Sequence, residues 1–289
     1  GTIFSLDEKA KKAGISVVPH IGLDVGIDRV LCGVGSRKLD QVDSFYVWCG
    51  GFPAKDTEGY NNPLRYKISW YWPYAVNSNL GSSTVLIDGK TVTKENLSEI
   101  DTVTFPEPIG DTEAYVTSGL MDVPEHLGLN GIKNAVAKTL RWPGHKDIWM
   151  KLREMHLLDQ EEIDVRGVKV KPYDVFIALG HKHLQYNDDE SDAICQRVTV
   201  AGTEDDKPTS YSFEFMHFHD FENDISAMAK TTAWPCSIVA QMMANGEFDK
   251  KGVVHPAWIG YEEKLSEKFF KELGRRGIKI TTSKETGFN

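Results

Sequence analysis

The sequence predicts an α/β (α+β) protein, in which a mixed β-sheet with flanking helices follows the last helix and strand of a doubly wound sheet. Residues 5–13 are rich in Ala and Lys and end at a glycine, and the apolar run 15–18 follows directly. This order indicates a helix, a tight turn and a buried strand. A glycine-containing turn at 22–26 then leads into a helical stretch at 27–39, which continues the rhythm of a doubly wound sheet. From residue 44 onward, β-type alternation dominates and indicates the mixed sheet.

The remaining elements follow from alternation, helical periodicity and turn chemistry. Asp88-Gly89 lies between two β-prone runs, 84–87 and 90–93, and predicts a hairpin because glycine tolerates the positive φ that a two-residue turn demands. A polar loop is expected at 54–63, and a polar, mobile tail is expected after 281. Further strands are expected at 44–49, 66–72, 102–105, 193–201, 210–219 and 278–281, and further helices at 131–138, 146–155, 173–179, 226–245 and 262–276.

Composition narrows the class of protein. The chain has 33 Lys and Arg against 42 Asp and Glu, so its net charge of −9 has the wrong sign for neutralising a nucleic-acid backbone. No apolar run approaches the roughly 20 residues that span a bilayer, and the first residues lack the pattern of a signal peptide. We expect a cytoplasmic protein whose four separated cysteines are reduced and mostly buried.

Three motifs occur in a fixed order along the chain. They are Gly22-Leu23-Asp24-Val25-Gly26-Ile27-Asp28, Cys49-Gly50-Gly51-Phe52-Pro53 followed by Asn62-Pro63-Leu64-Arg65-Tyr66-Lys67-Ile68-Ser69-Trp70, and Thr139-Leu140-Arg141-Trp142-Pro143-Gly144-His145. Together they resemble the saccharopine dehydrogenase family in its C-terminal substrate and dimerisation domain. Segments 113–119, 227–232 and 252–256 resemble lysine 6-dehydrogenase and its relatives more than saccharopine reductases.

The resemblance implies an NAD(P)-dependent oxidoreductase that acts on a carbon–nitrogen bond of lysine or a lysine-derived compound. Saccharopine dehydrogenase (L-glutamate-forming) activity and a non-catalytic ligand-binding or oligomerisation module remain alternatives. By the same resemblance, residues 1–28 would be the terminal piece of a Rossmann domain and residues 29–256 the substrate-binding and dimerisation domain. Residues 257–289 would form a C-terminal helix and tail that pack back toward the Rossmann side.

No glycine-rich phosphate loop lies between a strand and a helix in this sequence. The nearest pattern, Gly33-Val34-Gly35, falls inside a predicted helix, where a packing seam of small residues is the simpler interpretation. The main binding site for NAD or NADP is therefore expected outside this chain, which would be inactive without it, and the sequence does not distinguish the two cofactors. An excised fragment is expected rather than a naturally truncated protein.

Asp24 is the predicted catalytic residue. In the family the glycine turn lies where nicotinamide meets substrate, and Asp24 matches a carboxylate that contacts the amino-acid ligand, where it could hold an ammonium or iminium nitrogen. The alternative is that Asp24 only caps the helix that follows it. The resemblance also implies that Leu23, Val25 and Trp70 contact the cofactor.

Arg141 matches a substrate-binding segment of the family, together with Thr139 and Leu140. Its guanidinium is expected to hold the α-carboxylate of the substrate, and the alternative is a structural arginine stacked on Trp142 or Tyr115.

Ser118 stands where saccharopine reductases typically place a second carboxylate-binding arginine. A serine hydroxyl cannot replace that bidentate contact, so a substrate with one amino-acid end is favoured over an opine with two. Asp24 itself follows the saccharopine-reductase version of the glycine turn, which leaves the substrate open.

Two histidine pairs, His181/His183 and His217/His219, allow a metal-hydrolase alternative, but the other ligand motifs such a site needs cannot be assembled, so no metal site is predicted. Cys49 is expected to be a packed thiol. A homodimer is expected because family relatives pair through their mixed sheets. Four aromatic residues, Trp70, Tyr71, Trp72 and Tyr74, form a cluster suited to such an interface.

Overall fold

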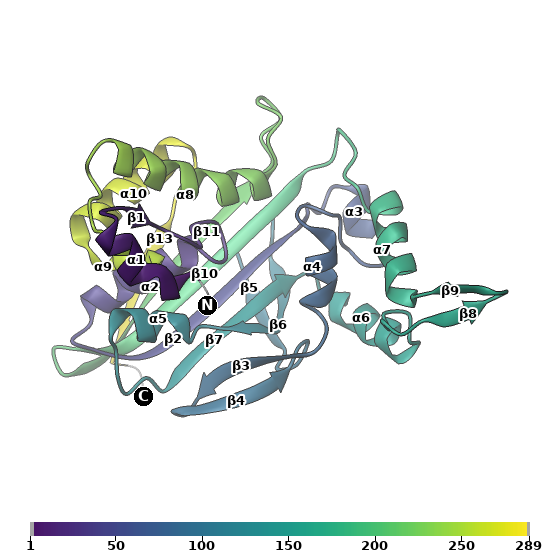
Figure 1. Ribbon diagram of the computed structural model, residues 1–289, viewed down its shortest axis with the longest axis horizontal. Coiled ribbons are helices and arrows are strands. Elements are labelled where there is room, and N and C mark those ends of the chain that lie inside the picture. Colours follow the sequence, from purple (N-terminus) through teal and green to yellow (C-terminus); the bar gives the residue numbers. More distant parts are fainter. Residues whose placement is uncertain (1–2, 288–289) are drawn as a thin grey trace.

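The structure of the protein is a computed structural model that describes residues 3–287 (Figure 1). Its helices are a short 3-10 turn at Phe4–Leu6, α1 (Asp7–Lys12), α2 (Ile27–Lys38), α3 (Glu58–Asn61), α4 (Trp72–Asn77), α5 (Asp122–Leu127), α6 (His145–Glu154), α7 (Pro172–His183), α8 (Ala227–Ala244), α9 (Pro256–Tyr261) and α10 (Glu263–Arg275). Its strands are β1 (Ser16–Val17), β2 (Gln41–Pro53), β3 (Ser82–Ile87), β4 (Lys90–Glu95), β5 (Asp101–Thr104), β6 (Asp111–Gly119), β7 (Asn134–Arg141), β8 (Ile163–Val165), β9 (Val168–Val170), β10 (Asp192–Glu204), β11 (Lys207–Phe218), β12 (Gly252–Val253) and β13 (Thr281–Thr286).

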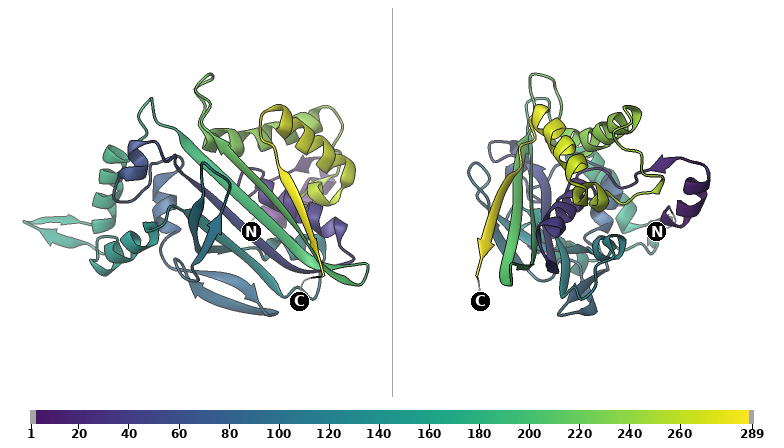
Figure 2. Two further views of the ribbon diagram at one scale, coloured as in Figure 1. Left: turned by 180° about the vertical axis from the view of Figure 1, so that it is seen from behind. Right: turned by 90° about the vertical axis from the view of Figure 1, so that its left-hand side faces the viewer.

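A mixed β-sheet forms the centre of the molecule, as the sequence predicts. Over the described residues it has nine strands in the order β13-β11-β10-β2-β7-β3-β4, with β6 pairing β7 and β5 pairing β6. Strands β2 and β7 run parallel and most other pairs run antiparallel. Helices from both ends of the chain lie together on one face of the sheet (Figure 2).

The start of the chain has a helix and a strand where the sequence predicts them, and β1 pairs in parallel with β12. The prediction that this strand is buried is wrong, because β1 is half-buried and Ile15 before it is 52% exposed. One hydrophobic core extends from Ile21 to Ile278 and joins the glycine turn and α2 to the sheet and the C-terminal helices. The expected domain boundary at 28/29 falls in the first turn of α2.

The glycines of α2 form the predicted packing seam. A Cβ atom on Gly33 would lie 1.9 Å from the carbonyl oxygen of Ala257, and one on Gly35 would meet Val200 at 2.5 Å. Gly260 faces Val30 in the same way, with 1.8 Å between its Cβ and the Val30 carbonyl oxygen. Helices α2 and α9 can therefore pack backbone to backbone, which fixes the segment that precedes α2.

Two predicted elements are wrong. Residues 131–138 were expected to be helical, but 134–141 form strand β7, because pairing with β2 and β6 on its two sides outweighs the helix preference of its alanines. Residues 66–72 were expected to form a strand, but the chain is irregular there and α4 begins at Trp72, with Pro73 in its first turn.

Smaller differences occur elsewhere. The loop at 54–63 contains the short helix α3. A strand was expected at 278–281, but residues 278–280 are irregular, and the tail expected to be mobile instead forms edge strand β13, which pairs with β11. The last two residues of that tail lie outside the described residues. Strand β6 and helices α5 and α9 are absent from the sequence-based assignment.

Helix α4 splits the aromatic cluster proposed for an interface. Trp72 is buried at 1% exposure in a small core with Tyr66 and Trp149. Tyr71 and Tyr74 are 70% and 63% exposed. The prediction that all four aromatic residues share one surface is therefore wrong.

Candidate functional site

A cavity of about 610 Å³ lies where the glycine turn meets the ends of β2, β6 and β7, with α4 and α8 at its sides. Because β2 and β7 are parallel and Cys49 pairs with Thr139, the carboxyl ends of both strands reach this place. A Cβ on Gly50 would lie 2.2 Å from the carbonyl oxygen of Leu140, so glycine is required for this close approach. The strand ends and the turn together form the walls of one site.

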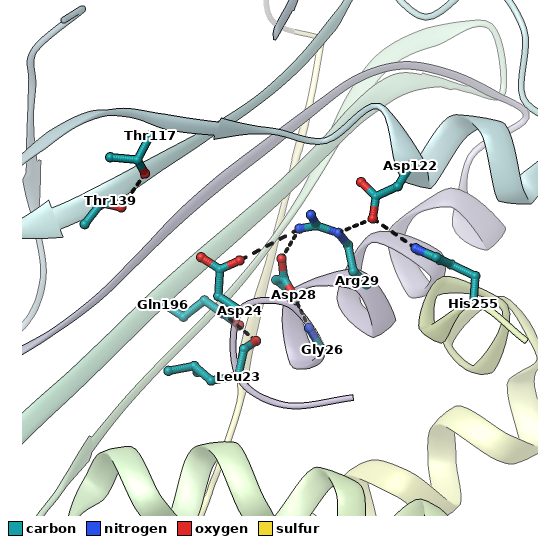
Figure 3. Close-up of polar contacts among 10 residues, drawn as sticks. All are labelled: Leu23, Asp24, Gly26, Asp28, Arg29, Thr117, Asp122, Thr139, Gln196 and His255. Carbon is teal, nitrogen blue, oxygen red and sulfur yellow. Dashed lines mark hydrogen bonds and ion pairs between the residues drawn. The ribbon is translucent and has the colours of Figure 1, made fainter. Parts of the chain in front are cut away.

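The turn at 22–26 is closed by its own backbone. The Gly22 amide donates to the Val25 carbonyl at 2.9 Å, and the Ile27 amide donates to the Gly22 carbonyl at 2.9 Å. Gly26 has φ 155°, and a Cβ there would lie 2.0 Å from the Gly22 oxygen, so only glycine fits. This turn carries Asp24 into the cavity (Figure 3).

Asp24 is not the cap of α2. The N-cap position is Gly26, and its amide donates to Asp28 Oδ1 at 2.7 Å. The side chain of Asp24 retains 29% of its surface exposed and lines the cavity. Burial raises the pKa of Asp24 to about 7, and the negative charges of Asp28 and Asp122 add to the rise while Arg29 opposes it.

Behind Asp24 lies a chain of polar groups from α2, α5 and the residue before α9 (Figure 3). Arg29 Nη1 lies 4.0 Å from Asp24 Oδ1 and also contacts Asp28, while Arg29 Nε donates to Asp122 Oδ2 at 2.8 Å. His255 Nε2 lies 3.0 Å from the same Asp122 oxygen. Burial works against ionisation of Asp122, but the hydrogen bond from His255 and the charge of Arg29 keep its pKa below the ordinary value.

Arg141 is a buried cation with no ionic partner among residues 3–287. The residue is 6% exposed, and its Nη1 donates only to the Leu140 carbonyl, at 2.7 Å. Its Nε has no hydrogen-bond partner within the described part of the chain. The guanidinium lies 5.4 Å from the centre of the Tyr66 ring, so the stacking partner is neither Trp142 nor Tyr115. Arg141 lines the cavity and can accept an anion there.

The other predicted substrate residues divide between the two faces of β7. Thr139 lines the cavity and shares a hydroxyl hydrogen bond of 2.5 Å with Thr117 of β6. Leu140 is fully buried on the opposite face, against Phe52 and Trp142. Only the main chain of Leu140 remains near the cavity.

The predicted cofactor residues Leu23, Val25 and Trp70 all line the cavity. Two aliphatic side chains and an indole suit the faces of a nicotinamide ring, so the residues present fit that end of the cofactor. Cys49 also lines the cavity, and burial raises the pKa of its thiol well above the ordinary value, as expected for a packed, unreactive cysteine.

Arg29, Asp122 and His255 were not predicted. Arg29 lies in the first turn of α2, five residues after Asp24, and this nearness in sequence could have suggested a contact. Asp122 and His255 are separated by 133 residues, and no local pattern connects them. Only the packing of α5 and α9 against α2 places them together.

The histidine pairs do not form a metal site within residues 3–287, where no three potential ligands of the His, Cys, Asp or Glu type converge. His181 and His183 are exposed at the end of α7. His217 and His219 are partly buried near the end of β11. In the part of the chain that the structure describes, no helix has the length and apolarity to cross a membrane.

The fold and the cavity define a class: an α/β domain whose pocket combines a guanidinium without an ionic partner in the described residues and a carboxylate. A profile of the family "Saccharopine dehydrogenase C-terminal domain" matches residues 22–278, and the chain belongs to this family.

Relatives support this assignment at low sequence identity. Alpha-aminoadipic semialdehyde synthase, mitochondrial, of Bos taurus is 25% identical over 96% of this chain, which spans 36% of that protein. Saccharopine dehydrogenase [NADP(+), L-glutamate-forming] of Saccharomyces cerevisiae is 24% identical over 93% of this chain and 73% of its own length. The chain thus spans about a third of the length of the bovine relative.

A solved structure shares the fold. Apo histidine-tagged saccharopine dehydrogenase (L-Glu forming) from Saccharomyces cerevisiae matches with a TM-score of 0.80 at 20% identity, covering 97% of this chain and 76% of that one.

Proposed function

We propose that this chain is the substrate-binding part of an NAD(P)-dependent oxidoreductase that acts on a carbon–nitrogen bond of lysine or a lysine-derived amino acid. One observation carries the proposal: a single cavity holds an unpaired guanidinium, Arg141, and a carboxylate, Asp24. An amino acid with a second amine presents the complementary groups, a carboxylate and an ammonium. The family and the names of its relatives support the reaction class.

The residues of this chain bind and orient the substrate. Arg141 holds the α-carboxylate, Asp24 holds the reacting nitrogen, and Leu23, Val25 and Trp70 exclude water beside the carbon that loses hydride. Hydride acceptance is the chemistry that a bound NAD or NADP supplies. Because Arg141 holds one end of the substrate and Asp24 the other, the carbon that is oxidised has a fixed position between them.

Lysine, or a similarly short diamino acid, is the preferred substrate because the cavity offers one free cation. Over residues 3–287 two arginines line the cavity: Arg29 is engaged by Asp28 and Asp122, whereas Arg141 retains an unpaired nitrogen. Ser118, which the family resemblance aligns with a second carboxylate-binding arginine, lines the same cavity.

Two further cations, Lys67 and Arg65, do not supply a second carboxylate site. Lys67 is buried and paired with Glu190 at 2.6 Å. Arg65 donates only to the Pro143 carbonyl, but neither Arg65 nor Lys67 lines the cavity within the described chain.

Saccharopine is the second candidate substrate. The yeast relative is named for that activity, and a cavity of about 610 Å³ has room for an opine. Neutral donors that line the cavity, such as Ser118, would then have to hold the additional carboxylates.

Calorimetry of the chain with L-lysine tests the proposed function. We expect binding, and we expect Arg141→Gln to weaken it about tenfold or more, because a charge-assisted hydrogen bond contributes about 1.5–3 kcal/mol. Arg65→Gln is the matched control, because Arg65 lies outside the cavity, and it should bind lysine as the parent chain does. Equal affinity of the Arg141 variant and the parent would contradict the assigned role.

We also propose a homodimer and a cytoplasmic location for the protein. The hairpin β8–β9 projects away from the body of the molecule (Figure 1) and exposes Ile163, Val165 and Val168 at 48–60%. A two-stranded hairpin is marginally stable alone in water, so these side chains favour coverage by a second copy.

A further inference from the structure

The polar groups behind Asp24 form a continuous array from the cavity to α9. Arg29 bridges Asp28 and Asp122, and Asp122 Oδ2 accepts hydrogen bonds from Arg29 and His255 at 2.8 and 3.0 Å. Helix α2 contributes Asp28 and Arg29, α5 contributes Asp122, and the residue before α9 is His255. Asp24, supplied by the glycine turn, and Arg29 both line the cavity.

The tautomer of His255 is fixed by its neighbours. The Ala257 amide donates to His255 Nδ1 at 3.2 Å, so a neutral ring must carry its proton on Nε2 and donate to Asp122. The residue is 3% exposed, and burial lowers the pKa of its imidazole against the opposing effect of Asp122. His255 therefore acts as a neutral donor that holds the Asp122 carboxylate in place.

The charges of the array do not cancel. Asp28 and Asp122 contribute two negative charges and Arg29 one positive charge, so one negative charge remains before Asp24 is counted. The thiols of Cys32 and Cys49 are also near Asp24, and burial raises the pKa of both. Across the cavity, the described residues add the cation Arg141 and the phenol of Tyr74. Strand β10 faces the turn with Gln196, which is neutral and donates to the Leu23 carbonyl at 3.4 Å.

We propose that Asp24 accepts the proton of the substrate ammonium, and that Asp122, held by His255 and Arg29, is a positioning residue that supplies the negative charge behind it. The step moves one proton: the N–H bond of the ammonium breaks, an O–H bond forms on Asp24, and the amine keeps its electron pair for the oxidation that follows. This inference rests on the proposed function, because it assigns the base for the same substrate.

Binding of L-lysine to the chain should therefore release a proton that depends on pH. Below the pKa of Asp24 the empty site holds a proton on the carboxyl, whereas the complex holds a single proton between carboxyl and amine. Calorimetry in buffers of different ionisation enthalpy should give about one proton released per lysine at pH 6 and none at pH 8.5. Asp24→Asn should abolish the release at pH 6.

Two variants of the array should shift the titration of Asp24 in opposite directions. Asp122→Asn preserves an oxygen for both hydrogen bonds but removes a negative charge, so the pKa of Asp24 followed by carboxyl NMR should fall by about one unit. Arg29→Gln removes the positive charge and should raise the pKa of Asp24. Glu125→Gln, on the exposed side of the same helix α5, is the matched control and should leave the titration unchanged.

The outcomes separate this inference from the proposed function. Equal titrations of Asp24 in the parent and Asp122→Asn would overturn the inference and leave the proposed function standing. Lysine binding without proton release at pH 6 would overturn the inference and also the contact between Asp24 and the ammonium in the proposed function. Absence of lysine binding at every pH would overturn both. Opposite shifts in the two variants could not arise from a general loss of structure, which would move both titrations toward the ordinary carboxyl value.

Discussion

Asp24 and Arg141 are two residues of opposite charge that the folded chain leaves without full neutralisation. Both were predicted from sequence motifs, and the structure places both in the wall of one cavity. Motifs could locate these residues because each lies in a short segment with a fixed backbone, a glycine turn or a strand end. The partners Asp122 and His255 could not be predicted, because only tertiary packing brings them near.

Asp24 should lower the stability of the protein at alkaline pH. Its pKa is near 7 when folded and about 4 when unfolded, so the folded state binds more protons between these values. The unfolding free energy should therefore fall as pH rises from 4 to 7. Since water reaches the side chain, we expect Asp24→Asn to stabilise the protein at pH 8 by about 1–2 kcal/mol.

Urea denaturation at pH 4.5 and pH 8 measures this effect. The variant and the parent should have similar stability at pH 4.5, where Asp24 is protonated in the folded state. A variant that is less stable than its parent at pH 8 would show that the ionised carboxylate is stabilised by its surroundings.

At the scale of elements, strand pairing decides the cases where sequence patterns fail. The segment 131–138 contains two alanines and two lysines that favour a helix, yet Ala135 and Ala137 are buried in a strand. The small side chains of Ala135 and Ala137 fit β7 because this strand pairs with β2 on one side and β6 on the other. The same strand contributes residues to the cavity. Helix α2, in contrast, was predicted with nearly correct bounds, because its glycine seam and periodicity are local features.

A buried ion pair ties the loop before β10 to the segment before α4. Lys67 Nζ lies 2.6 Å from Glu190 Oε2, both residues are 5% exposed, and Glu190 also accepts from the amides of Gly59 and Asn187. Glu190→Gln should lower the unfolding free energy by about 3 kcal/mol, since it leaves a buried ammonium without a counter-charge.

An exposed ion pair provides the control for this variant. Lys55 and Glu107 lie 3.5 Å apart with side chains 38% and 81% exposed, so Glu107→Gln should cost less than about 1 kcal/mol. Chemical denaturation of both variants measures the loss of unfolding free energy that each substitution causes. Equal costs for the two substitutions would show that the buried pair contributes no more than a surface pair.

At the scale of the whole molecule, the mixed sheet and its flanking helices agree with the fold predicted from sequence, and the family assignment explains why. The predicted division at residues 28/29 remains a prediction, although one core joins Ile21 to Ile278. The exposure of individual aromatic residues was the least predictable feature. Trp72 is buried, whereas Tyr71 and Tyr74 are exposed. Burial of an aromatic residue depends on which helix face it occupies, and α4 itself was not predicted.

The exposed hairpin gives a test of assembly. If the protein is a homodimer, sedimentation at micromolar concentration should give about twice the 32.4 kDa mass of the chain. Replacing Val165 and Val168 by lysine should shift the species toward monomer, because it charges the exposed apolar hairpin. A parent chain that sediments only as monomer would contradict the proposed dimer.

The central claim is that the cavity binds an amino acid whose amine is oxidised. The most direct test is to join this chain to a dinucleotide-binding domain and to measure the rate at which the assembled protein reduces the nicotinamide cofactor. We expect kcat/KM for lysine at least tenfold above that for saccharopine, since one charge-assisted hydrogen bond typically exceeds the 1.4 kcal/mol that tenfold represents. Ser118→Arg should narrow this gap. Reduction that is faster with saccharopine would contradict the substrate assignment, and an assembled protein that binds lysine and nicotinamide but transfers no hydride would contradict the central claim.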